Sequence, residues 1–151
     1  MTSLTSVDEI TVQYNPSNKE VDRRIITSSK DSYRTIIEFF PDGMIQLQEQ
    51  FAVIYLNRSN QVLGVYKMSV GGITGTIVDL RLLLSVALKT LATGIIIAHN
   101  HPSGNLKPSM ADEEITQKLK SAASLMDISL LDHLILVGGT EYFSFADEGI
   151  I

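Results

Sequence analysis

The sequence contains no cysteine, and it has only three histidines in 151 residues. The lack of cysteine excludes disulfide scaffolds, thiolate zinc sites, cysteine nucleophiles and iron–sulfur clusters. Any protein-bound metal would therefore need histidine, aspartate or glutamate ligands. Two of the three histidines, His99 and His101, are separated by one residue. This pair is the most informative feature of the sequence.

Excess positive charge and long apolar runs are also missing. Lys and Arg total 12 against 17 Asp and Glu, a formal net charge of −5, so the chain is a poor candidate for coating nucleic acid. The most apolar stretch, residues 80–98, is interrupted by Arg81 and Lys89 and does not predict a membrane span. Residues 1–11 lack the basic and apolar regions of a secretion signal, so we expect a cytoplasmic protein without membrane contact.

The length and the 44% hydrophobic content predict one domain with a sizeable core. We expect a polar N-terminal extension over residues 1–28, with at most one or two short strands (9–13 and 21–27), followed by a domain over 29–151. Patterns of apolar residues and turn signals predict helices over 29–40, 79–91 and 109–126 and strands over 51–56, 61–70, 95–98, 134–137 and 142–145. The first two strands read as a hairpin.

The order of these elements predicts an α/β fold, a mixed central sheet with helices on both sides. In the helix over 79–91, the polar residues Arg81, Ser85 and Lys89 recur every four positions. This spacing predicts one narrow exposed stripe, with the rest of that helix buried.

His99 and His101 follow a short apolar strand. Residues i and i+2 of an extended chain point the same way, so the two imidazoles can bind one cation. Asp112 follows in the first turn of the next helix and completes a three-ligand set with one position left for water. Each residue alone also has a structural explanation: Asp112 suits the helix dipole, and Ser109 with Asp112 resembles a capping box.

Other metal motifs do not fit the sequence. A zinc deaminase needs a glutamate after its histidine and a later pair of cysteines, and the helical H-E-x-x-H motif is absent. A two-metal hydrolase would need further histidines and aspartates near this loop. The remaining interpretation is a single catalytic zinc with one open position.

His99-x-His101, followed after seven residues by Ser109-x-x-Asp112, resembles the JAMM motif of the JAMM/MPN metallopeptidases. The flanking residues 98–104 and 107–109 resemble the RadC branch of that superfamily, as do Asp132-His133 ahead of a strand and residues 144–146. The resemblance covers residues 29–151. Longer RadC-type proteins carry a helix-hairpin-helix region ahead of this part. The 28 residues here are too few and too polar to form one, which weakens the DNA-repair association of that family for this chain.

The resemblance implies that His99, His101 and Asp112 hold Zn²⁺ and that Glu49, just before a core strand, is the general base that activates water. Glu38 is a weaker competitor for that role. Ser109 would donate to the developing oxyanion, although helix capping competes for the same side chain. Ser103 is a lesser candidate for the oxyanion role and more typical of a turn. His133 would support the site or the sheet.

The resulting expectation is a zinc-dependent hydrolase, a metallopeptidase or isopeptidase that acts on an amide bond of a protein or peptide substrate through a metal-activated water. The alternative is a RadC-like scaffold or DNA-repair-associated binding protein without peptidase activity. Hydrolysis of another bond, such as a phosphodiester, is a third interpretation. Contact with nucleic acid is implied only by analogy with the family.

Overall fold

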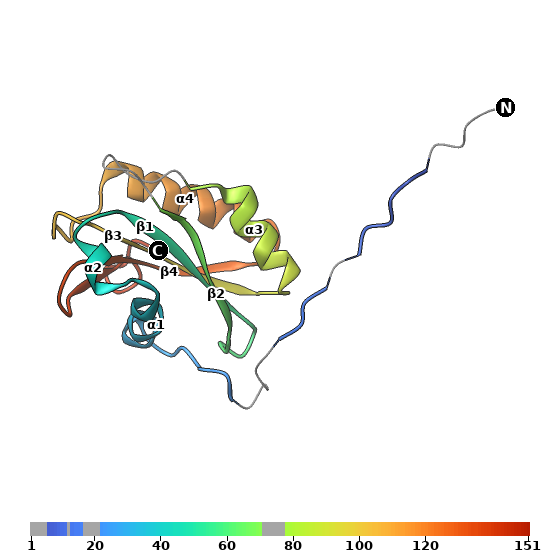
Figure 1. Ribbon diagram of the computed structural model, residues 1–151, viewed down its shortest axis with the longest axis horizontal. Coiled ribbons are helices and arrows are strands. Elements are labelled where there is room, and N and C mark those ends of the chain that lie inside the picture. The colour runs from blue at the N-terminus through green and yellow to red at the C-terminus, as the bar shows by residue number, and fades with distance from the viewer. Residues whose placement is uncertain (1–5, 12, 17–21, 71–77) are drawn as a thin grey trace.

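The computed structural model describes residues 6–11, 13–16, 22–70 and 78–151 (Figure 1). Its helices and strands, in chain order, are α1 (Ser29–Ile36), the 3₁₀ helix η2 (Ile37–Phe39), α2 (Asp42–Ile45), β1 (Gln50–Leu56), β2 (Val62–Val70), α3 (Leu80–Lys89), β3 (Gly94–Asn100), α4 (Met110–Ser124), β4 (Ser129–Leu136) and β5 (Tyr142–Ser144). The predicted mixed sheet with helices on both sides is confirmed.

The five strands form one sheet in the order β2-β1-β3-β4-β5. β1 is antiparallel to both β2 and β3, β3 is parallel to β4, and β4 is antiparallel to β5. All residues of β1 and β3 are buried, because these two strands lie inside the sheet and are covered on both faces. The β1–β3 register places Phe51 opposite His99, which brings the start of β1 beside the end of β3.

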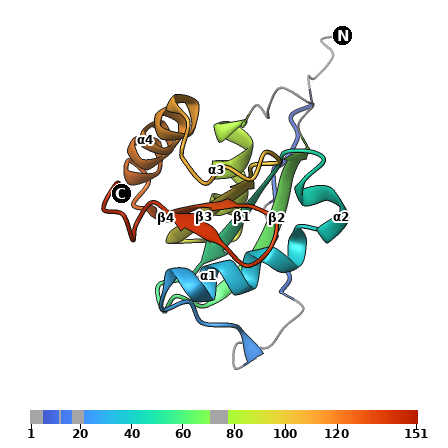
Figure 2. The same cartoon turned by 90° about the vertical axis from the view of Figure 1, so that its left-hand side faces the viewer.

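Each face of the sheet has its own layer of core side chains. Phe51, Val53 and Tyr55 of β1 pack with residues of α3 and α4, whereas the alternate residues Ala52 and Ile54 pack with residues of α1 and α2. Figures 1 and 2 show α3 and α4 on one side of the sheet and α1 on the other. This alternation decides on which side of the sheet each functional side chain lies.

Several sequence expectations are confirmed with shifted ends. The predicted helices over 29–40, 79–91 and 109–126 form, and β1 and β2 make the predicted hairpin. β3 is longer than predicted and includes His99, and β4 begins at Ser129, so that His133 lies inside a strand rather than ahead of one. The glycine pair at 71–72, expected to adopt an unusual backbone, lies outside the described residues.

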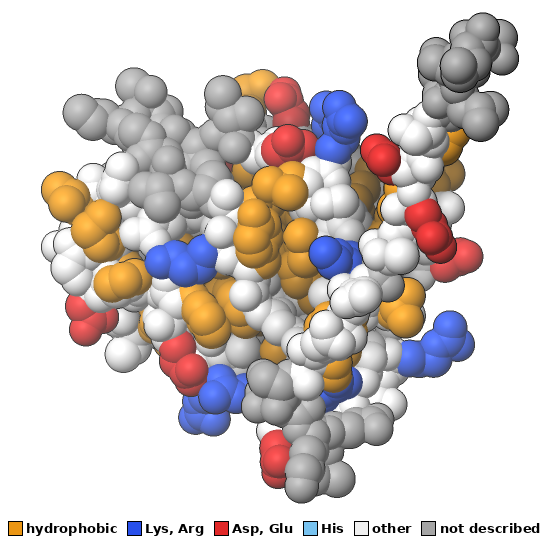
Figure 3. All heavy atoms as spheres, turned by 45° about the vertical axis from the view of Figure 1, so that its right-hand side comes forward, with side chains coloured by type: hydrophobic (Ala, Val, Ile, Leu, Met, Phe, Trp, Pro, Cys, Tyr) orange, Lys and Arg blue, Asp and Glu red, His pale blue; other side chains and the backbone are white. Residues whose placement is uncertain are grey.

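The sequence allowed at most one or two short strands ahead of α1, over 9–13 and 21–27. None forms in the described residues 6–11, 13–16 and 22–27, where the only pairing is an isolated bridge between Ile25 and Gln61, and residues 12 and 21 lie outside the described residues. The expectation for the helix over 79–91 is wrong. In α3, Leu82 and Leu88 are 40% and 50% exposed, so the helix is not buried outside a narrow polar stripe. α3 packs on the sheet along one side only, and hydrophobic side chains reach the surface of this part of the molecule (Figure 3).

None of the helices in the described part of the chain combines the length and the apolar character that a membrane span requires.

Candidate metal centre

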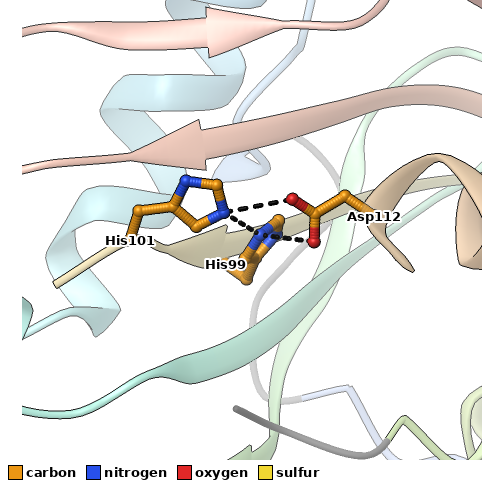
Figure 4. Close-up of side chains that lie close together, drawn as sticks. All are labelled: His99, His101 and Asp112. Atoms are coloured by element: carbon orange, nitrogen blue, oxygen red, sulfur yellow. Dashed lines mark hydrogen bonds and ion pairs between the residues drawn. The ribbon is translucent and has the colours of Figure 1, made fainter. Parts of the chain in front are cut away.

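The two histidines of the motif lie at the end of β3: His99 belongs to the strand, and His101 is the first residue after it. The apolar run that precedes them makes β3 a buried central strand, and residues 99 and 101 project to the face covered by α3 and α4. His99 is buried and His101 is partly exposed, and their Nε2 atoms lie 2.9 Å apart (Figure 4). The strand end therefore brings two potential ligand atoms together, and the loop that follows supports the ring of His101 through the Asn105 carbonyl oxygen.

Asp112 reaches this pair from the first turn of α4. Its Oδ1 lies 3.1 Å from Nε2 of His99, and its Oδ2 lies 3.1 Å from Nε2 of His101. Ser109 is the N-cap of α4: its Oγ accepts a hydrogen bond from the Asp112 backbone N–H, and its own backbone N–H donates to Oδ2 of Asp112 at 2.8 Å. The capping box thus forms, and it aims the carboxylate at the histidines.

The hydrogen bonds of His101 show which of its ring nitrogens is free to bind a cation. Nδ1 of His101 lies 2.6 Å from the carbonyl oxygen of Asn105, which can only accept, so Nδ1 carries a proton and a neutral His101 keeps its Nε2 lone pair toward His99 and Asp112. Two nitrogens and a carboxylate then converge as acceptors within 4.8 Å of one another. Ligand atoms around a tetrahedral zinc lie roughly 3.3 Å apart, for bonds of about 2.0–2.1 Å. The three residues therefore fit a metal ion.

The pKa shifts describe the same site when a proton, rather than a metal ion, lies between the histidines and the carboxylate. The hydrogen bond to Asp112 raises the pKa of His101, against the opposing effect of burial. Burial also opposes ionisation of Asp112, yet the hydrogen bonds with His101 and His99 hold the pKa of its carboxyl well below the usual range. The site stabilises positive charge on its histidine side and negative charge on its carboxylate.

Glu49, the predicted general base, lies near His101. It directly precedes β1 and stands two residues before Phe51, whose ring stacks on that of His99 with centroids 6.4 Å apart. The negative charge of Glu49 also contributes to the raised pKa of His101. The structure thus places the partly buried Glu49 near enough to His101 for its charge to act on that imidazole.

Glu38, the weaker competitor, lies elsewhere. It belongs to η2, whose neighbours Ile36 and Phe40 pack in the core layer on the opposite face of the sheet. Its carboxylate forms an ion pair of 3.0 Å with Arg24. This position separates Glu38 from the histidine pair by the thickness of the sheet. Ser103 also has a local partner, because its Oγ accepts from the backbone N–H of Asn105 in the exposed loop.

A RadC-like JAB domain model matches residues 26–150. The chain belongs to the RadC family. A UPF0758 protein of Flavobacterium johnsoniae is 49% identical over 128 residues, which are 83% of this chain and 53% of the relative. A UPF0758 protein of Porphyromonas gingivalis is 43% identical over 90% of this chain and 59% of its own length. The UPF0758 protein YfjY of Escherichia coli is 44% identical, over 69% of this chain and 64% of the relative. The RadC-family chain described here spans about half the length of the first two relatives.

Asn100, which the sequence did not single out, organises the segment that carries Glu49. It lies between the two histidines, so its side chain points to the opposite face, where it is fully buried. Its amide nitrogen donates to the carbonyl oxygens of Ile45 and Gln48 at 2.7 and 2.9 Å, and its Oδ1 accepts from the backbone N–H of Gln50 at 2.6 Å. The only sequence signal was a polar residue at an inward position of a buried strand.

His133 and Thr116 extend the site in the RadC-family chain beyond the motif. Nε2 of His133 lies 2.8 Å from Nδ1 of His99, and Nδ1 of His133 lies 2.6 Å from Oγ1 of Thr116 on α4. Burial, and after it the neighbouring His99, lowers the pKa of His133 well below the usual value, so this imidazole is neutral. The sequence assigned His133 a supporting role but contained no signal for Thr116.

Proposed function

We propose that this RadC-family chain is a zinc-dependent hydrolase of the JAMM type that cleaves an amide bond in a protein or peptide, as a metallopeptidase or isopeptidase. The observation that carries this proposal is the convergence of His99, His101 and Asp112, with Glu49 directly ahead of the neighbouring strand β1 and near enough for its charge to act on His101. A purely structural role would account for the capping box of Ser109 and Asp112. It would not account for two histidine nitrogens that converge with the Asp112 carboxylate.

His99, His101 and Asp112 would hold the ion. Zinc, when bound in such a site, supplies Lewis-acid polarisation of a carbonyl and lowers the pKa of water toward about 7. The carboxylate of Glu49 would accept the proton of the attacking water and transfer it to the leaving amine. The covering helices and the buried neighbours of His99 keep one side of the site dry, which strengthens these charge interactions.

Ser109 can serve both as cap and as oxyanion donor. Its Oγ accepts from the backbone N–H of Asp112, and this bond uses a lone pair rather than the hydroxyl proton. The proton of Ser109 remains available to donate toward the developing oxyanion. Capping of α4 and donation to an oxyanion therefore use different parts of the Ser109 hydroxyl, so one side chain can perform both roles.

The test begins with zinc content and continues with substrates. Protein purified without chelator should contain about one zinc per chain, and the zinc-loaded protein should be screened on peptides, isopeptide-linked conjugates and branched DNA. Glu49→Gln should retain zinc and lose turnover, whereas the matched variant Glu38→Gln, on the opposite face of the sheet, should retain both. A chain that takes up no zinc at neutral pH contradicts the proposal. A zinc-loaded chain inactive on every substrate would favour the scaffold function, and cleavage of DNA alone would favour phosphodiester hydrolysis.

A further inference from the structure

A completely buried histidine outside the motif contacts one of the proposed zinc ligands. His133 of β4 is 0% exposed, and its ring stacks on Phe145 with centroids 4.5 Å apart. The rings of Phe51 and His133 make an edge contact at a centroid distance of 6.5 Å. The two ring nitrogens of His133 bond to His99 and Thr116, so the imidazole links β3, β4 and α4 through an apolar environment.

The directions of these hydrogen bonds follow from the distances. Oγ1 of Thr116 lies 2.6 Å from the backbone carbonyl oxygen of Asp112. Two oxygens can approach this closely only with a proton between them, and a carbonyl has none, so the Thr116 hydroxyl donates to Asp112. With its single proton committed, Oγ1 can only accept from His133, which places the His133 proton on Nδ1.

The tautomer of His133 also determines that of His99. A neutral His133 with its proton on Nδ1 presents a lone pair on Nε2, and Nδ1 of His99 at 2.8 Å must donate to it. The proton of a neutral His99 is therefore on Nδ1, and its Nε2 lone pair faces His101 and Asp112. We propose that His133 and Thr116 are positioning residues, which fix the tautomer and ring orientation of His99 for metal binding.

This arrangement differs from the support of His101, whose Nδ1 donates to the Asn105 carbonyl oxygen in an exposed loop. Metal-bound histidines generally donate their second N–H to an acceptor that orients the ring, and loss of such an acceptor typically lowers metal affinity about 10–100-fold. For His99 the acceptor is a neutral imidazole, so it orients the ring without adding negative charge. Asp112 and Thr116 are one turn apart on α4. One helix therefore positions both a potential ligand and the first residue of the hydrogen-bond chain Thr116–His133–His99.

The inference rests on the metal site of the proposed function but not on any peptidase activity. Zinc affinity should be measured by competition titration for His133→Leu, which removes the acceptor, and for His133→Gln, whose side-chain carbonyl can replace Nε2. We expect His133→Leu to weaken zinc binding about 10–100-fold and His133→Gln to restore most of that loss. Equal affinity of His133→Leu and the unaltered chain would overturn the inference.

A second pair of variants covers the case in which His133→Leu does not fold. Thr116→Val keeps the shape of the side chain but removes its hydroxyl, and Thr116→Ser keeps the hydroxyl. Zinc affinity should fall several-fold in Thr116→Val and stay near that of the unaltered chain in Thr116→Ser. Thr35→Val, a buried threonine in α1 on the opposite face of the sheet, is the matched control and should bind zinc normally. Equal zinc affinity of Thr116→Val and Thr116→Ser would count against a positioning role of the Thr116–His133–His99 hydrogen-bond chain.

Nitrogen-15 NMR of the metal-free chain at pH 8 gives a readout that needs neither zinc nor substrate. His99 and His133 should both carry their proton on Nδ1, and Thr116→Val should remove the preference in His133. A proton on Nε2 of His99 in the unaltered chain would overturn the inference, even if zinc binds. Failure of the unaltered chain to bind zinc would instead contradict the proposed function, so the two outcomes are distinguishable.

Discussion

Replacement of Asn100 by alanine should destabilise the fold and impair the proposed chemistry through Glu49, while the zinc ligands remain in place. The Asn100 side chain is fully buried and forms three hydrogen bonds of 2.6–2.9 Å to the backbone around α2 and the start of β1. Each buried hydrogen bond contributes about 0.5–1.5 kcal/mol net, and water cannot reach the groups left behind. We therefore expect a loss of roughly 2–4 kcal/mol in the free energy of unfolding.

The same change should separate zinc binding from turnover. His99 is held by the backbone pairing of β3, and the backbone N–H of His101 donates to the Leu136 carbonyl oxygen, whereas Glu49 lies in the segment that the Asn100 side chain holds by hydrogen bonds. Zinc affinity should therefore stay within a few-fold of the unaltered chain. Turnover on any substrate found in the screen should fall, since a displacement of about 1 Å can cost around 100-fold in rate.

Urea unfolding and zinc titration test both parts, with Asn57→Ala as the matched control. Asn57 also forms three side-chain hydrogen bonds, of 2.8–3.0 Å, but in the partly exposed turn at the other end of β1. It should lose about 1 kcal/mol or less and keep full activity, because water replaces its lost partners. A loss below about 0.5 kcal/mol in Asn100→Ala would refute the energetic reasoning. A ten-fold loss of zinc affinity would show that Asn100 acts on the ligand pair instead.

Three further predictions concern the ligand set, the core and the pH dependence. Asp112→Asn should lower zinc affinity by more than the roughly 10–100-fold typical of changes outside the ligand shell, as measured by competition titration. Tyr55→Phe should cost about 1–3 kcal/mol in urea unfolding, because the buried Tyr55 hydroxyl donates to the Leu83 carbonyl oxygen at 2.9 Å. In the metal-free chain, burial lowers the pKa of His133 below 6.5, so the stability linked to this group is complete above about pH 6.5 and falls as the pH drops, by up to about 1.4 kcal/mol per pH unit. His133→Gln should show a shallower fall between pH 6.5 and 5, whereas an unchanged slope would contradict this assignment.

Local sequence patterns were sufficient for much of the architecture. The spacing of apolar residues located all three long helices and the strands of the hairpin, because helix and strand periodicity are properties of neighbouring residues. The same holds for the motif itself. His99 and His101 share a face because a strand alternates its side chains, and Ser109 caps α4 because its Oγ is three residues from the Asp112 N–H.

Local patterns were less reliable where exposure depends on distant elements. The helix over 79–91 was expected to bury all but a narrow polar stripe, but α3 packs on the sheet along one side and leaves Leu82 and Leu88 at the surface. The sequence shows that a helix is apolar, but not how much of its circumference another element covers. Strand lengths shifted for a similar reason, since pairing with neighbours extends β3 through Asn100 and draws His133 into β4.

What the sequence by itself determined is the set of residues that could bind a metal, because their types and spacing are local. Only the tertiary structure decided what surrounds them. The β1–β3 register placed the start of β1, which Glu49 directly precedes, opposite His99, and the packing of η2 on the opposite face separated Glu38 from the histidines. Likewise, Thr116, His133 and Asn100 take their roles from partners 17 to 55 positions away in the chain. Strand order and helix packing determine such contacts, because they join residues that no local periodicity connects.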